Sequence, residues 1–96
     1  MKPDIELRFA HEAEDDIDDI LQYTFEAWGS VQEQSYRETL RQAFLSIRDN
    51  PGISWRRADG HDREFRLRHH AIVYHHDEAA NTVTILRIVN TRRRSR

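Results

Sequence analysis

The stretch that decides the fold is "AEDDIDDILQYTFEAWGSVQEQSYRETLRQAFLSIRDNPG", residues 13–52. Its first half repeats small or apolar side chains at steps of three and four, the period of an amphipathic helix: Ala13, Ile17, Ile20, Leu21, Thr24 and Trp28. Gly29 ends this helix, and a second stripe follows: Tyr36, Leu40, Ala43, Phe44 and Ile47. Because only one or two residues separate the helices, they must turn back on each other as an antiparallel hairpin.

The ends of both helices carry recognisable signals. Ser30 and Glu33 have the S-x-x-E spacing of a capping box, which predicts Ser30 as the N-cap of the second helix. "NPG", residues 50–52, ends that helix, and residues 53–62 have no period and are expected to form a loop. Four carboxylates crowd the first turns of the first helix, where the helix dipole favours negative charge: Glu12, Glu14, Asp15 and Asp16.

Strands flank the helical region. "IELRF", residues 5–9, alternates apolar and polar side chains and predicts a short half-buried strand. "REFRLR", "AIVYHH" and "TVTILRIV" alternate or are rich in β-branched residues, which predicts three more strands within residues 63–90. The chain is therefore expected to be one α+β domain over residues 1–96: an N-terminal strand, an antiparallel helix hairpin and a three-stranded antiparallel meander. The helices should pack on one face of the sheet, and residues 91–96 form a basic tail.

A register can be predicted for the meander. A two-residue turn at His69 and His70 would pair Arg68 with Ala71, and Phe65 with Tyr74. The face under the helices would then hold Phe65, Leu67, Ile72, Tyr74, Thr84, Leu86 and Ile88. The opposite face would hold Arg66, Arg68, Val73, Val83, Ile85 and Arg87. Two histidines suit such a turn poorly, so a slip of one residue is the alternative.

Composition indicates the cellular compartment of the protein and the charge of a possible partner. The chain has no cysteine and begins without an apolar run long enough for a signal peptide or membrane span, so a cytoplasmic protein away from membranes is expected. Residues 1–50 hold five Lys or Arg against twelve Asp or Glu, whereas residues 51–96 hold ten against five. The basic half is free to meet an anionic partner.

The histidines of "RLRHHAIVYHH", residues 66–76, do not predict a metal site. On a strand, His69 and His75 share one face and His70 and His76 share the other, and each pair is six residues apart. That spacing is roughly 20 Å, too far for two ligands of one zinc ion. We expect neither a metal nor a cofactor.

Four pieces, in order, resemble the ParE branch of the RelE/ParE toxin superfamily. They are "AEDDIDDILQYTFEAWG", "YRETLRQAFLSIRDNPG", "FRLRHHAIVYHH" and "VTILRIVNTRRR", which together cover nearly the whole chain. The resemblance implies a bacterial toxin of a type II toxin–antitoxin pair, held inactive in a hetero-oligomer by a ParD-like antitoxin. ParE-like toxins stabilise the cleaved-DNA state of DNA gyrase, whereas RelE-like toxins cut mRNA on the ribosome.

The residues favour gyrase poisoning over RNA cleavage. A nuclease needs a base, an acid and cations for the phosphate, for which Arg66, Arg68, His75 and Arg92 are the candidates. However, Ala71 stands where RelE-like proteins carry arginine. For gyrase binding, the resemblance implies Arg87, and the basic tail adds Arg92, Arg93, Arg94 and Arg96. The alternative for Arg87 is an ion pair within the fold.

The antitoxin should contact exposed aromatic side chains. The candidates are Phe25, Trp28 and Trp55, although Trp28 could instead belong to the core. A third class of function, a plain nucleic-acid-binding module, is less favoured because no aromatic residues are interleaved with the arginines of the tail.

Overall fold

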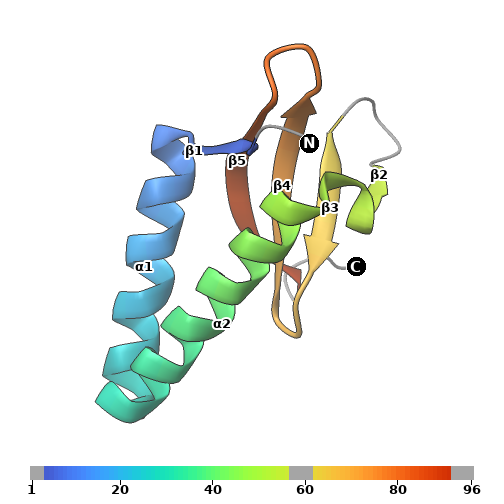
Figure 1. Cartoon of the computed structure of the whole chain (residues 1–96). Helices are drawn as coiled ribbons and strands as arrows, with labels where there is room; N and C mark the ends of the chain where they lie inside the picture. Colours follow the sequence, from blue (N-terminus) through green and yellow to red (C-terminus); the bar gives the residue numbers. More distant parts are fainter. Residues whose placement is uncertain (1–3, 57–61, 92–96) are drawn as a thin grey trace.

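The structure, a computed structural model, describes residues 4–56 and 62–91, except for the side chains of Trp55 and Arg56. The elements follow the expected order of strand, two helices and further strands (Figure 1). They are β1 (Glu6–Phe9), α1 (His11–Trp28), α2 (Ser30–Asp49), the 3-10 helix η1 (Pro51–Ile53), β2 (Trp55–Arg56), β3 (Arg63–Arg66), β4 (His70–Asp77) and β5 (Thr82–Asn90). Among the described residues, no helix combines the length and the apolar character that a membrane span requires.

The sheet has five strands in the order β1-β5-β4-β3-β2. The predicted antiparallel meander is confirmed as β3, β4 and β5, and β1 joins β5 in parallel. The β1–α1–α2 segment makes this parallel pairing possible, because the chain crosses over the sheet before it returns. The strand β2 falls in residues 53–62, which were expected to form only a loop, and it contributes just two residue pairs with β3.

The two helices cover one face of the sheet (Figure 1). Helix α2 crosses over β4 and β3, and α1 lies beside it, toward β5. Gly29 alone joins the helices, with φ at +92°, a backbone conformation that favours glycine. The predicted antiparallel hairpin is therefore confirmed, and its turn is as short as a turn can be.

The predicted capping box at Ser30 is wrong. Gly29 occupies the N-cap position of α2, and Ser30 is already helical, so its hydroxyl makes no capping hydrogen bond. The carbonyl of Gly29 accepts the hydrogen bond from Glu33 N–H, and the Glu33 carboxylate pairs with Arg37. The S-x-x-E pattern failed here because a one-residue connection leaves no room for a separate cap.

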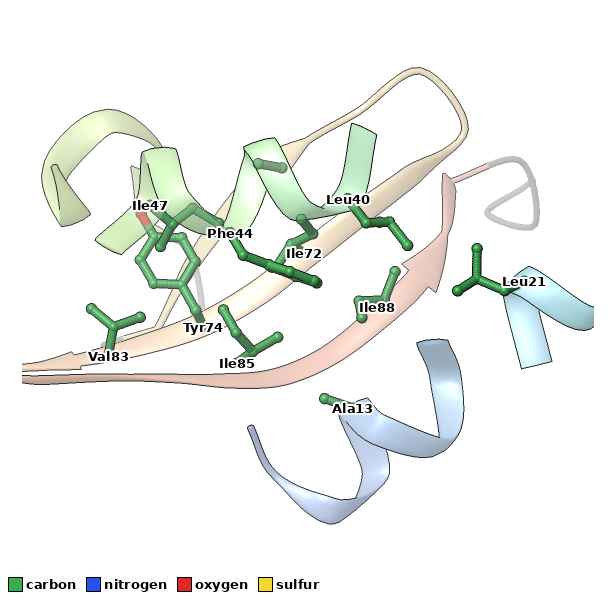
Figure 2. Packing of buried hydrophobic residues seen from close by; sticks show 11 residues of the cluster. Ala13, Leu21, Leu40, Phe44, Ile47, Ile72, Tyr74, Val83, Ile85 and Ile88 are labelled. Carbon is green, nitrogen blue, oxygen red and sulfur yellow. The ribbon is translucent and has the colours of Figure 1, made fainter. Parts of the chain in front are cut away.

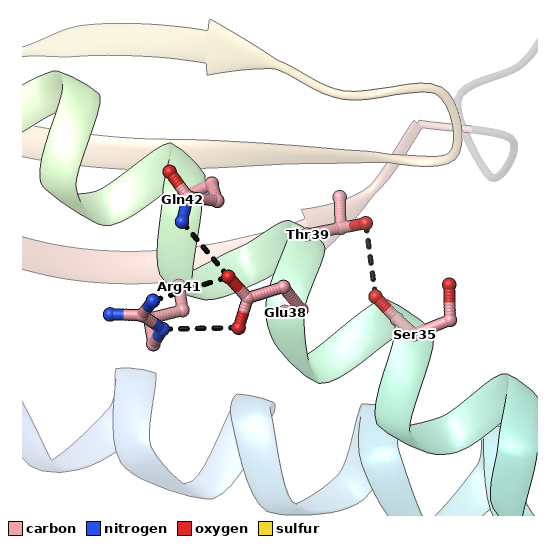
Figure 3. A network of polar contacts seen from close by, with 5 residues as sticks. All are labelled: Ser35, Glu38, Thr39, Arg41 and Gln42. Carbon is pink, nitrogen blue, oxygen red and sulfur yellow. Dashed lines mark hydrogen bonds and ion pairs between the residues drawn. The ribbon is translucent and has the colours of Figure 1, made fainter.

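The outward side of α2 is held by local polar contacts. Glu38 accepts hydrogen bonds from Arg41 and from Gln42, and Thr39 donates its hydroxyl to the Ser35 carbonyl (Figure 3). The contact with Arg41, followed by that with Gln42, lowers the pKa of Glu38. These pairs lie on the solvent side of the helix, so they support α2 weakly and leave its opposite side for the core.

The turn between β3 and β4 lies one residue earlier than predicted. It is centred on Arg68 and His69, and Phe65 pairs with Ile72 instead of Tyr74. A type I′ hairpin turn requires positive φ at both central residues and a type II′ turn requires it at the first, but neither Arg68 nor His69 has positive φ. Because the pairing moves by two residues, alternation keeps Phe65, Ile72 and Tyr74 on the helix-covered face.

The predicted faces of β5 are partly wrong because of a β-bulge. The register between β4 and β5 shifts by one residue, and Leu86 is the extra residue. Val83 and Ile85 are consequently buried in the core, where Thr84 and Leu86 were expected. Arg87 lies beyond the bulge and keeps its predicted place on the opposite face.

The core fills the space between the helices and the sheet (Figure 2). The rings of Phe9 and Phe44 meet edge to face, with 5.1 Å between centroids. The predicted stripe of α2 is confirmed, but Trp28 at the end of the α1 stripe is 71% exposed and stands outside the core. The buried members of the cluster are Ala13, Leu21, Leu40, Ala43, Phe44, Ile47, Ile72, Tyr74, Val83, Ile85 and Ile88.

Candidate functional site

The sheet face opposite the helices, called the open face below, carries three of the four described residues that were proposed for a target. Strand alternation places Arg66, His75 and Arg87 on this face. Arg66 lies 3.0 Å from a carboxylate oxygen of Glu64, and Arg87 lies 2.8 Å from one of Asp16. Both arginines are therefore already engaged by carboxylates of the same chain.

Asp16 connects α1 to β5 beyond the end of β1. Its carboxylate accepts hydrogen bonds from Arg87, at 2.8 and 3.2 Å, and from the backbone N–H of Ile88 at 2.9 Å. Burial raises the pKa of Asp16, but the hydrogen bonds from Arg87 and Ile88 outweigh it, so this pKa lies below its ordinary value. The internal ion pair considered for Arg87 is thus present. A contact of Arg87 with gyrase stays a prediction.

His75 forms the pair on the open face that most resembles an acid–base group. Its Nδ1 lies 3.3 Å from Asp62, and both side chains are about half exposed. Arg66, however, pairs with Ala71, four positions away from His75 along β4. Four residues of strand span about 13 Å, so His75 and Arg66 do not converge on one phosphate group.

The basic tail begins at the edge of the described region. Arg92, Arg93, Arg94 and Arg96 lie outside the described residues. The last described residue, Thr91, donates its backbone N–H to the carbonyl of His69 at 3.0 Å. The tail therefore starts beside the β3–β4 turn, which carries the exposed side chain of Arg68.

The end of the helix hairpin exposes aromatic side chains. Phe25 is 54% exposed and Trp28 is 71% exposed, and Tyr23 and Val31 are exposed as well. The structure therefore favours the surface interpretation of Trp28 over the core interpretation. The third candidate antitoxin contact, Trp55, belongs to β2, but its side chain lies outside the described part of the structure.

An open groove of about 370 Å³ runs between α1 and α2 next to Phe25. Three apolar residues and four polar residues line it: Ile17, Leu21, Phe25, Asp18, Gln22, Glu33 and Arg37. The sequence stripe identified Ile17 and Leu21 as core residues, and it could not reveal that their edges stay accessible. The groove is open to solvent and is lined by both helices of the hairpin.

Two polar links inside the fold were missed by the sequence analysis. The Tyr36 hydroxyl lies 2.6 Å from Nδ1 of His70, and the Tyr74 hydroxyl donates to the Pro51 carbonyl at 2.5 Å. Burial raises the pKa of Tyr36 to about 12, and burial together with the neighbouring His69 lowers the pKa of His70. The available signal was the tyrosine itself, because a tyrosine on a core stripe needs a hydrogen-bond partner.

The described residues bring no set of metal ligands together. Within residues 4–56 and 62–91, no three or more His, Cys, Asp or Glu side chains gather closely enough to hold a metal ion. His11 lies on the first turn of α1, 3.5 Å from Asp15, and His61 lies outside the described ranges.

The fold is that of toxin–antitoxin structures. A chain from the chromosomal ParDE toxin–antitoxin system of P. aeruginosa aligns with a TM-score of 0.78 and 16% identity, over 90% of this chain and 95% of that one. A chain of the E. coli RelBE complex aligns with a TM-score of 0.67 and 18% identity, over 91% and 96%. A chain of the M. tuberculosis RelBE2 complex gives 0.63 and 20%, over 92% and 99%.

The sequence identifies the family. Residues 7–95 match the family model described as the ParE toxin of the type II toxin–antitoxin system parDE. The chain therefore belongs to the ParE toxin family. A comparison with curated proteins gave no match.

Proposed function

We propose that this ParE-family chain arrests bacterial growth by poisoning DNA gyrase in the cytoplasm, and that a ParD-like antitoxin neutralises it in a hetero-oligomer. The observation that carries the choice of gyrase is the pairing of the open-face arginines. Arg66 forms an ion pair with Glu64 and Arg87 forms one with Asp16, so a phosphate group would have to displace a carboxylate of the same chain, whereas about half of each arginine side chain stays exposed for contact with a protein surface. A toxin that acts by binding needs a surface and no acid–base set of its own.

The proposed gyrase-binding surface combines one residue of the open face with the basic tail, which lies outside the described residues. It consists of Arg87 on β5 and the tail residues Arg92, Arg93, Arg94 and Arg96. Supporting this choice, Thr91 donates its N–H to His69 in the turn that also carries the exposed Arg68, and a concentration of cations favours an anionic partner. Phe25, Trp28 and Trp55 are the proposed antitoxin contacts, and the exposure of the first two supports that role.

A second candidate is ribosome-dependent mRNA cleavage, favoured by the contact between His75 and Asp62. A carboxylate at Nδ1 orients an imidazole and leaves Nε2 facing away from that contact, where it could exchange a proton with a substrate. In this alternative Arg66, Arg68 and Arg92 would hold the phosphate. The spacing of about 13 Å between the positions of His75 and Arg66 on the sheet argues against it.

Induction of the chain in bacteria that carry a reporter plasmid tests the proposal. We expect growth arrest with loss of plasmid supercoiling, while messages stay intact. Co-expression of a ParD-like antitoxin encoded beside the gene should restore growth. Message cleavage with normal supercoiling would favour the nuclease instead, and His75→Ala would then abolish the growth arrest.

A further inference from the structure

Strand β1 forms one edge of the sheet. It pairs with β5 on one side, and no strand of the described residues lies on its other side. Glu6 and Ala10 donate their backbone N–H groups toward the β5 side, at 3.1 and 2.8 Å. Because backbone groups alternate in direction along a strand, those of Leu7 and Phe9 point to the outer edge. The outer edge of β1 therefore offers hydrogen-bonding groups that another strand can use.

Helix α1 lies past the end of β1 and not beside it. Phe9, the last residue of β1, pairs with Ile85 of β5. Asp16 in α1 contacts the backbone of Ile88, three residues further along β5. The chain therefore continues along β5 after β1 ends, and α1 packs mainly against α2 and β5. This path leaves the outer edge of β1 accessible.

The side chains of β1 and the residue before it alternate between an apolar side and a charged side. Ile5, Leu7 and Phe9 pack against the core but are only partly buried. Glu6 and Arg8 lie on the open face, where they form an ion pair at 3.0 Å and are 59% and 61% exposed. One side of this edge is thus apolar, and the other carries one charge of each sign.

Two copies of this edge are complementary in one antiparallel register. The outward backbone groups belong to odd-numbered residues, so hydrogen bonding across the edge matches odd with odd and even with even positions. A pairing centred on Leu7 places Glu6 of each copy opposite Arg8 of the other, and Ile5 opposite Phe9. A slip of two residues either way would instead place Glu6 opposite Glu6 or Arg8 opposite Arg8. Charge therefore selects the register centred on Leu7.

We propose that β1 pairs with β1 of a second copy of this chain, antiparallel and centred on Leu7, so that the two sheets become one. Both open faces then lie on the same side of the joined sheet, because the charged side chains of both strands meet there. The antiparallel pairing directs the two acidic α1 helices away from each other. The pairing covers residues 5–9 of each copy, far fewer than the roughly 20–30 residues a side of a standard interface, so the dimer is weak.

Sedimentation equilibrium of the full chain measures this dimer. The average mass should rise from that of one chain toward that of two as the protein concentration increases. Glu6→Arg and Arg8→Glu each replace both opposite-charge contacts with like-charge contacts and should weaken dimerisation about tenfold. An equimolar mixture of these two variants restores opposite charges across the edge and should form a mixed dimer.

Helix α2 supplies matched controls. Glu38 and Arg41 form a similarly exposed ion pair on its solvent side, with guanidinium contacts at 3.1 and 3.2 Å. Glu38→Arg and Arg41→Glu therefore make the same charge changes away from β1 and should leave dimerisation unchanged. Circular dichroism checks that each variant is folded.

Hydrogen exchange of the backbone amides locates the contact. The amides of Leu7 and Phe9 face the proposed partner strand, so their exchange should slow as the protein concentration rises. The amide of Glu6 already bonds within the chain and should exchange at the same rate throughout.

Four results would overturn the inference. A single-chain mass at every concentration up to roughly 1 mM would exclude even a weak dimer. A dimer that the β1 charge variants do not weaken, or one that Trp28→Ala abolishes, would place the contact elsewhere. Slow exchange of the Leu7 amide only after a ParD-like antitoxin is added would assign the edge to the antitoxin.

The growth assay is independent of these measurements. If the chain arrests growth but stays monomeric, only the inference fails. If the chain dimerises through β1 but growth continues, only the proposed function fails.

Discussion

Replacing Asp16 with alanine removes the contact that joins α1 to β5. The carboxylate is largely buried, with 15% of the side chain exposed, and it accepts hydrogen bonds from Arg87 and from Ile88 N–H. Leaving a buried N–H unpaired costs about 1–3 kcal/mol. Loss of an ion pair to a half-exposed arginine adds about 0.2–1 kcal/mol. We therefore expect Asp16→Ala to lower the free energy of unfolding by about 1–4 kcal/mol.

Two further variants separate the contribution of the ion pair from that of the backbone hydrogen bond. Asp16→Asn keeps an oxygen for the N–H of Ile88 and removes the charge, so we expect a smaller loss of about 1 kcal/mol. Arg87→Ala removes the ion pair and keeps the backbone contact, and it should also cost less than Asp16→Ala. If the ion pair is the shared term, the double variant should lose less than the sum of the two single alanine variants.

The difference in free energy of unfolding between wild type and Asp16→Ala should become smaller as the pH falls. Because the pKa of Asp16 is lowered in the folded state, its contribution is present above the unfolded value of about 3.8 and disappears as the pH falls through the folded value. The difference between wild type and Asp16→Ala should therefore stay constant from about pH 8 to pH 5 and narrow below about pH 4.

Urea denaturation followed by circular dichroism measures these differences. Equal midpoints for wild type and Asp16→Ala at pH 7 would refute the role assigned to this carboxylate. A difference that widens on acidification would refute the assigned direction of the pKa shift.

The remaining predictions concern stability and toxicity. Burial lowers the pKa of His70, so the unfolded chain binds a proton first, and stability should fall as the pH drops below about 6.5; His70→Asn should flatten this dependence in urea titrations. Trp28→Ala should change the free energy of unfolding by less than about 0.5 kcal/mol, because the side chain is 71% exposed, whereas Leu40→Ala in the core should cost about 2–5 kcal/mol by the same measurement. Arg87→Ala and deletion of residues 92–96 should each abolish growth arrest on induction, while Asp16→Ala, which breaks the same ion pair from its other side, retains it. Full toxicity of both the Arg87 and the tail variants would remove the proposed gyrase-binding surface.

Most of the fold followed from hydrophobic period. The stripe of α2 from Tyr36 to Ile47 and the alternation of β1 and β3 report directly which side of each element is buried. The short connection at Gly29 also predicted the antiparallel hairpin, because two helices joined by so few residues pack against each other. These features are local, so one sequence is enough to reveal them.

The predictions for the faces of β5 and for Trp28 were wrong because contacts between residues distant in sequence determine which side chains are buried there. The bulge at Leu86 lies just after the residues of β5 that pair with both β1 and β4, and alternation in the sequence carries no sign of it. Trp28 continues the period of α1 but extends past the end of the sheet, so nothing covers it. The helical period predicted correctly which side of α1 Trp28 lies on. It could not predict how far along α1 the rest of the fold covers that side.

The candidate site was only partly predictable for the same reason. Asp16 and Arg87 are 71 residues apart in sequence, and nothing local connects them. The sequence explained the acidic run of α1 by the helix dipole, and it did not reveal that Asp16 in this run contacts Arg87 and Ile88 of β5. Similarly, the groove beside Phe25 exists only once α2 supplies its second wall.

Purified components test most directly whether the chain traps gyrase, as proposed, or acts by acid–base chemistry of its own. The chain is incubated with gyrase, supercoiled plasmid and ATP, and protein-linked cleaved DNA is measured; a parallel reaction holds ribosomes and message. We predict accumulation of cleaved DNA that His75→Ala does not diminish, with intact message in the parallel reaction. Cleaved message with uncleaved plasmid, abolished by His75→Ala, would contradict the proposal.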